Sequence, residues 1–168
     1  YYPGLSYQFG IPPFRLTLKI CDMKRHEALI PLSRDHHGTL ILARLLRSDA
    51  PPFKGLPLDA KGKAEYALKH YREELLEHFE QEEKMIPMIK GINPTLDSLL
   101  ACMKAEHQEL HSLFSSINID QNLSTQLDVI GRALESHVRK EDRVIFPLIQ
   151  ESCKEELLNK LADIFTEK

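Results

Sequence analysis

Paired cysteines and long apolar runs are both missing from this chain of 168 residues. A transmembrane helix needs about 20 consecutive apolar residues, and no stretch here approaches that length, so the sequence argues against a membrane span. The three cysteines are Cys21, Cys102 and Cys153, which are widely spaced and form no CxxC motif. We interpret them as reduced thiols, with Cys102 in the core, and we expect an unexported, cytoplasmic protein.

An excess of basic charge is also missing. Lys and Arg number 22 against 25 Asp and Glu, which gives a formal net charge of -3 and a pI near 6.3. This balance predicts neither nucleic acid nor an anionic membrane as a partner. The sequence contains no HExxH motif, no glycine-rich phosphate loop and no ExxH motif. Zinc hydrolase, nucleotide-binding and ferritin-like oxidase functions therefore lack their usual signatures.

The chain divides into a short irregular segment and one helical domain. Residues 1–22 contain three prolines and two glycines and show no helical period. We interpret them as a non-native extension before Met23, the alternative being a native arm that lies along the domain. Residues 23–168 are then a single domain, large enough to bury a core.

Helical periodicity dominates the domain, and strand signals are scarce. Apolar residues recur at three- and four-residue spacing, and glycine and proline fall mostly at segment boundaries. The expected fold is all-α, an antiparallel up-down four-helix bundle with a short C-terminal fifth helix and an irregular N-terminal arm. The predicted helices span residues 33–48, 60–90, 94–117, 123–150 and 153–166.

Histidine is common in this chain, with eight residues. The apolar faces of three long predicted helices are each interrupted by two polar residues that are four positions apart. That spacing stacks both side chains of a pair on one face of a helix. Burying carboxylates and imidazoles costs several kcal/mol each unless they are paired or bound to a cation, so the pattern predicts a metal site. The pairs are His78 with Glu82, His107 with His111, and His137 with Glu141.

A further imidazole is expected from the first helix, which offers two adjacent histidines. We select His37 because it flanks the apolar centre beside Ile41, whereas the alternative, His36, falls near Arg47. The other two histidines are assigned to solvent-facing or local hydrogen-bonding positions: His26 and His70.

Together these motifs resemble the hemerythrin-like family of HHE cation-binding domains, over about residues 24–150. The resemblance implies a four-helix bundle that holds two iron ions with a bridging oxide or hydroxide. It makes Glu82 and Glu141 the bridging carboxylates and makes the histidines terminal ligands. In oxygen-carrying members, the resemblance implies an HxxxxD pattern on the last helix, which would make Asp142 the carboxylate ligand there. The helical phase favours Glu141 instead. The implied histidine ligands are His37, His78, His107, His111 and His137.

This ligand set leaves one coordination position open on a pair of irons with about six positions each. The expected function is therefore binding of O2 or a related diatomic ligand such as NO, for sensing, storage or delivery. One alternative is a diiron enzyme that acts on NO or peroxide or supplies iron for iron–sulfur repair. Another is a structural or zinc-binding helical bundle. The sequence leaves open whether the protein is an enzyme and what its oligomeric state is.

Overall fold

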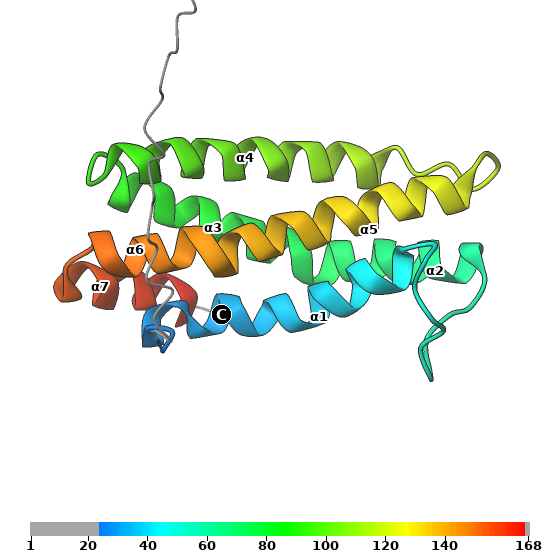
Figure 1. Ribbon diagram of the computed structural model, residues 1–168, viewed down its shortest axis with the longest axis horizontal. Coiled ribbons are helices and arrows are strands. Elements are labelled where there is room, and N and C mark those ends of the chain that lie inside the picture. The colour runs from blue at the N-terminus through cyan, green and yellow to red at the C-terminus, as the bar shows by residue number, and fades with distance from the viewer. Residues whose placement is uncertain (1–23, 167–168) are drawn as a thin grey trace, which may run out of the picture.

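The computed structural model describes residues 24–166, which are helical for most of their length and contain no strand (Figure 1). The all-α expectation is confirmed, and none of the described helices is long and apolar enough to cross a membrane. The expected extension 1–22, Met23 and Cys21 lie outside the described residues. The elements in order are η1 (Glu27–Leu29), α1 (Ile30–Leu46), α2 (Ala60–His70), η2 (Tyr71–Leu75), α3 (Leu76–Ile89), α4 (Pro94–Ser115), α5 (Leu123–Lys140), η3 (Glu141–Ile145), α6 (Phe146–Ser152) and α7 (Glu155–Thr166).

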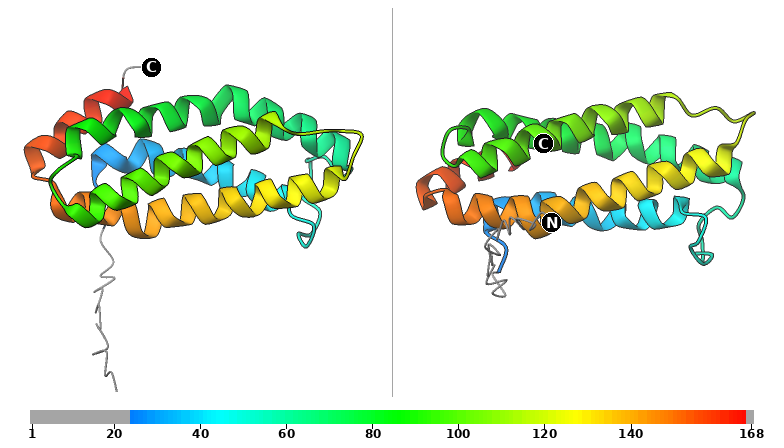
Figure 2. Two further views of the ribbon diagram at one scale, coloured as in Figure 1. Left: turned by 90° about the horizontal axis from the view of Figure 1, so that it is seen from above. Right: turned by 45° about the horizontal axis from the view of Figure 1, so that its top comes forward.

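Several of these elements join into long helical rods that lie side by side (Figures 1 and 2). One rod runs without a break from α2 through η2 into α3, and another runs from α5 through η3 into α6. α1 packs mainly against α5, and α7 lies against η1 and α3 at one end of the assembly. This arrangement brings segments that are far apart in the sequence around one elongated interior.

Local sequence signals explain most of the helix ends. Asn93 caps α4 by accepting hydrogen bonds from the first backbone amides, and Gly91 provides the positive φ of 86° in the preceding turn. The start of α1 differs from the prediction, because the helix begins at Ile30 and Ser33 is not its cap. Ser33 instead donates a hydrogen bond to Asp142 Oδ1 at 3.3 Å. α1 is therefore longer at its N-terminus than the sequence signals indicated.

Two π-helical turns interrupt the long rods. η2 ends shortly before His78, and η3 begins at Glu141. A π turn contains an extra residue relative to an α-helical turn, so it rotates the face that follows it. After the buried Glu141, Val144 is exposed and Ile145, four residues further on, is buried again.

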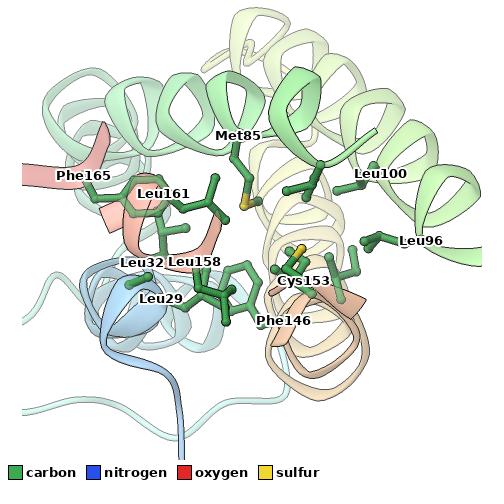
Figure 3. Close-up of a cluster of buried hydrophobic side chains, with 14 of the residues drawn as sticks. Leu29, Leu32, Met85, Leu96, Leu100, Phe146, Cys153, Leu158, Leu161 and Phe165 are labelled. Atoms are coloured by element: carbon green, nitrogen blue, oxygen red, sulfur yellow. The ribbon is translucent and has the colours of Figure 1, made fainter. Parts of the chain in front are cut away.

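The apolar core forms two clusters, one toward each end of the rods. Figure 3 shows the first, in which Leu158, Leu161 and Phe165 of α7 cover the end of the interior. Cys153 belongs to this cluster, whereas Cys102 is exposed on α4, so the expectation of a core position for Cys102 was wrong. Cys102 lies off the buried face of its helix, which runs through Leu96, Leu100, Met103, His107, Leu110 and Phe114.

Gly131 of α5 lies directly against the backbone of α1, and replacing it with alanine tests this packing. An added Cβ would lie 2.5 Å from the backbone oxygen of Ala43, so the helices must move apart. We expect Gly131→Ala to destabilise the fold by about 1–3 kcal/mol, measured by urea or thermal unfolding. Gly38→Ala is the matched control, since its Cβ would make only an ordinary contact of 3.5 Å with His70. Equal stability of the Gly131 variant and the wild type would contradict this account.

Candidate metal centre

Six ionisable side chains converge in the interior between the two apolar clusters. Each is at most 4% exposed, and both carboxylates are completely buried. Four different rods contribute, so the cluster exists only once the helices have packed. The residues are His36 of α1, His78 and Glu82 of α3, His107 of α4, His137 of α5 and Glu141 of η3.

One half of the cluster is formed by His36 and His78 together with one oxygen from each carboxylate. The Nε2 atoms of the two imidazoles are 3.1 Å apart. Glu82 Oε1 lies 3.3 Å from His78 Nε2 and 3.7 Å from His36 Nε2. Glu141 Oε2 lies 3.2 Å from His36 Nε2. All four donor atoms fit within 4.8 Å of one another, which is a group that could hold one metal ion.

The other half uses His107 and His137 with the second oxygen of each carboxylate. His107 Nε2 lies 3.3 Å from Glu82 Oε2 and 3.9 Å from Glu141 Oε1. His137 Nε2 lies 3.2 Å from Glu141 Oε1. These donors also fall within 4.8 Å of one another. Glu82 and Glu141 therefore belong to both groups, with one oxygen directed to each.

The hydrogen bonding of the buried atoms fits a cation. All four oxygens of Glu82 and Glu141 lack a hydrogen-bond partner, as do Nε2 of His107 and His137. A buried polar atom without a partner costs about 1–3 kcal/mol, and more if it is charged. Imidazole and carboxylate donors suit iron, zinc or manganese. The residues present thus match what a pair of bound metal ions would require.

Without a cation, protons balance the buried negative charge. Burial by itself would lower the pKa of His36, but the carboxylates of Asp142, Glu141 and Glu82 outweigh it and raise that pKa to about 11. For His107, burial is outweighed by Glu141 and Glu82, and the pKa rises to about 10. Burial opposes ionisation of Glu82, yet the facing imidazoles hold its pKa well below the usual range. The site therefore strongly favours positive charge beside its two carboxylates.

A second carboxylate faces the outer nitrogen, Nδ1, of every imidazole in the cluster. Such a partner fixes the orientation of a metal-binding histidine and makes it a better donor. Of these acids only Asp142 was considered from the sequence, as an alternative ligand to Glu141, although each acid is the chain neighbour of a cluster residue, which is a usable signal. The pairs are Asp142 with His36 at 3.1 Å, Asp35 with His78 at 3.7 Å, Glu83 with His107 at 3.1 Å and Glu106 with His137 at 3.0 Å.

On α1 the structure places His36, and not His37, in the cluster. His36 is 1% exposed, whereas His37 is exposed and lines a surface pocket beside Ile41. The preference for His37 depended on Ile41 as part of the apolar centre, but Ile41 is only partly buried. The buried face instead passes through Leu32, His36 and Thr39.

The second histidine of the HxxxH motif does not join the cluster either. His111 is partly buried, and its Nδ1 lies 2.7 Å from the hydroxyl of Tyr71. The ring of Phe79 stacks on His107 at 4.3 Å and meets His111 edge-on at 5.5 Å. His107 and His111 thus both contact Phe79 but have different hydrogen-bond partners, Glu83 for His107 and Tyr71 for His111.

Comparison with known proteins agrees with this geometry. The family model described as the hemerythrin HHE cation binding domain matches residues 31–149. The chain belongs to this family. A search of curated proteins and a search of solved structures each found no match. The family resemblance predicted from the His and Glu motifs is confirmed, and the matched range of this HHE domain includes all six residues of the buried cluster.

Metal binding should stabilise the fold through the buried cluster. Fe(II), added anaerobically at about 100 times its dissociation constant, should stabilise the native state by about 2.7 kcal/mol. In a chain of this size that corresponds to a rise in Tm of roughly 5–10 °C by scanning calorimetry. His36→Ala should lose most of this rise relative to its own metal-free Tm, because it removes a donor.

His37→Ala is the matched control, since it removes the adjacent, exposed imidazole. It should keep the full metal-dependent rise. A loss of the rise in His37→Ala but not in His36→Ala would show that the other histidine of α1 is the donor.

Proposed function

We propose that this protein is a non-haem diiron protein that binds O2 or a related diatomic ligand such as NO, for sensing, storage or delivery. The observation that carries the proposal is the position of Glu82 and Glu141. Each directs one oxygen to His36 and His78 and the other to His107 and His137. Two carboxylates shared in this way would bridge two ions, and membership of a cation-binding family supports a metal as their partner.

The proposed arrangement assigns a role to each residue of the cluster. His36 and His78 would hold one iron, His107 and His137 would hold the other, and both carboxylates would bridge them. A bridging oxide or hydroxide would complete the centre. When bound, a reduced iron pair supplies electrons and open coordination positions for a small ligand. The protein orients the imidazoles through the outer acids and keeps bulk water away from the buried carboxylates.

The placement of His111 changes the number of open positions. Four imidazoles in the cluster, in place of five, leave one more coordination position available than the sequence-based ligand set did. Because Tyr71 holds His111 at 2.7 Å, that imidazole already has a strong partner of its own. The proposed centre therefore has more room for an exogenous ligand.

A surface cavity of about 410 Å³ gives a diatomic ligand a way toward the cluster. Phe79 and His111 line it, together with Leu76, Glu80, Glu83 and Lys84. Phe79 lines the cavity and stacks on His107, so its ring contacts both the cavity and the cluster. We propose that the small ligand approaches past Phe79, whose apolar ring favours O2 or NO over ions.

The wider expectations belong to the same proposal. The rods of Figure 1 would form the up-down antiparallel four-helix bundle of the hemerythrin type. Cys102 and Cys153 are free thiols, which suits the reducing environment of the cytoplasm.

Enzymatic use of the same centre is the second candidate, and the Tyr71–His111 pair favours it. A hydroxyl hydrogen-bonded to an imidazole at 2.7 Å can move a proton, and His111 lines the cavity beside Phe79. Reduction of NO or peroxide consumes protons, so a proton-carrying pair beside the ligand cavity would serve such an enzyme.

Iron analysis and an optical spectrum test the proposed function. Reconstituted protein should hold about two irons per chain and show charge-transfer bands that shift on addition of azide. Glu82→Ala/Glu141→Ala should bind almost no iron, because both shared carboxylates are gone. Iron near zero in the wild type, or a firm preference for zinc, would contradict the proposal. Rapid mixing of the reduced protein with O2 then separates the candidates: a reversible adduct supports binding, and irreversible oxidation supports enzymatic use.

The two histidines of α4 should behave differently when replaced. His107→Ala should lose about one iron per chain, because it removes a buried donor of the second group. His111→Ala should keep both irons and change mainly the azide response, because its partner is Tyr71. Elemental analysis of the two variants, prepared in parallel, is the measurement. Loss of an iron in His111→Ala would show that this imidazole leaves Tyr71 and joins the centre when metal binds.

A further inference from the structure

A second hollow, of about 220 Å³, lies between α1 and the rod formed by η2 and α3, and His78 is one of its lining residues. Its chemistry differs from that of the cavity beside Phe79, because most of its lining groups are carboxylates. We call it the acidic vestibule. It is lined by Asp35, Glu73, Glu74, Glu77, His78 and Gln81.

The vestibule combines an exposed acidic rim with a buried floor. Glu73, Glu74 and Glu77 are exposed and come from η2 and the first turn of α3. Lys69 lies 3.9 Å from Glu73, which balances part of the charge. Gln81, which is buried, donates a hydrogen bond to Glu77 at 3.1 Å. The carboxylates still outnumber this cation, so the hollow attracts positive ions.

His78 forms the floor of the vestibule and also belongs to the metal cluster. It is 4% exposed, and its Nδ1 has no hydrogen-bond partner, the carboxylate of Asp35 being 3.7 Å away. Its Nε2 lies 3.3 Å from Glu82 Oε1 on the inner side. A single imidazole therefore joins the vestibule to the buried carboxylates, and its outer nitrogen makes no hydrogen bond, its contact with Asp35 being an ion pair at 3.7 Å.

A second imidazole contacts one of the carboxylates that line the vestibule, Glu74. His70, expected at the surface or in a local hydrogen bond, is only 8% exposed, and its Nε2 lacks a hydrogen-bond partner. Its Nδ1 lies 3.4 Å from Glu74 Oε1, in the same four-residue spacing as the cluster pairs. Imidazole and carboxylate donors beside one another suit a divalent transition-metal ion.

The vestibule is large enough to hold water as well as an ion. Its volume of about 220 Å³ is several times the roughly 30 Å³ that one water molecule occupies in the liquid. A cation can therefore enter with water still bound to it and exchange that water for protein donors afterwards.

We propose that the acidic vestibule is an entry site, which collects hydrated divalent cations and passes them beside His78 to the buried cluster. Under the proposed function, on which this inference rests, the cation is Fe(II). The rim carboxylates raise the local concentration of the ion, and the imidazoles provide donors as it loses water. The vestibule affects the rate of metal uptake rather than the final occupancy.

Rapid-mixing measurements of Fe(II) uptake test this proposal. Metal-free protein is mixed anaerobically with Fe(II), and the free ion is followed with a colorimetric chelator. Glu73→Gln/Glu77→Gln should load about tenfold more slowly than the wild type at low salt, because two rim charges are gone. Its final iron content should equal that of the wild type, since neither residue belongs to the cluster. Raising the salt concentration should slow the wild type toward the rate of the variant.

Glu109→Gln/Glu156→Gln is the matched control, because it removes two exposed carboxylates that do not line the vestibule. It should load at the rate of the wild type. Equal rates in the rim variant and the wild type, or equal slowing in both variants, would overturn the entry site while leaving the iron centre intact. Absence of iron uptake in all three proteins would overturn the iron centre as well.

Discussion

Two fully buried carboxylates, Glu82 and Glu141, set the constraint around which the interior is organised. Solvent cannot reach them, and no hydrogen bond satisfies their oxygens. Such groups are tolerated only where positive charge surrounds them, because an unpaired buried carboxylate costs several kcal/mol. The two apolar clusters, one on each side of the buried ionisable side chains, exclude water from them, which raises the cost of leaving the carboxylates without a cation. Metal binding and helix packing therefore depend on the same atoms.

The outer acids connect the four rods into a closed ring. On α1 and α4 the acid precedes the cluster histidine, as in Asp35–His36, and on α3 and η3 it follows the cluster glutamate, as in Glu141–Asp142. Each acid faces a histidine of another rod, so α1 supports α3, α3 supports α4, α4 supports α5, and η3 supports α1. Removing any rod would leave one imidazole without its supporting acid and one outer acid without its imidazole. The ring also gives Glu141 and Asp142 separate roles, the first in the cluster and the second behind His36.

The four-residue spacings were enough to predict the helices and most of the cluster, because residues that share a helix face must be buried together. They favoured the wrong one of two adjacent histidines, His37 in place of His36, since Ile41 was counted with the buried face of α1 but is only partly buried. They also placed His111 with His107, because spacing does not reveal that the hydroxyl of Tyr71 competes for that imidazole. The π turns change the phase of two rods without a sequence signal in the apolar pattern. Tertiary contacts, rather than helix propensity, decide each of these positions.

The two hollows beside the cluster differ in chemistry, although the rod formed by η2 and α3 contributes most of the lining of both. The cavity toward α4 is lined by Phe79 and closed by an aromatic ring stacked on His107, which suits a small uncharged ligand. The vestibule toward α1 is lined by carboxylates that the η2 turn presents to solvent, which suits a cation. A ligand and a metal ion would then reach opposite halves of one centre by separate routes. The η2 turn contributes to both sides of this arrangement, since it carries Glu73 and Glu74 of the vestibule and Tyr71, whose hydroxyl contacts His111 of the cavity.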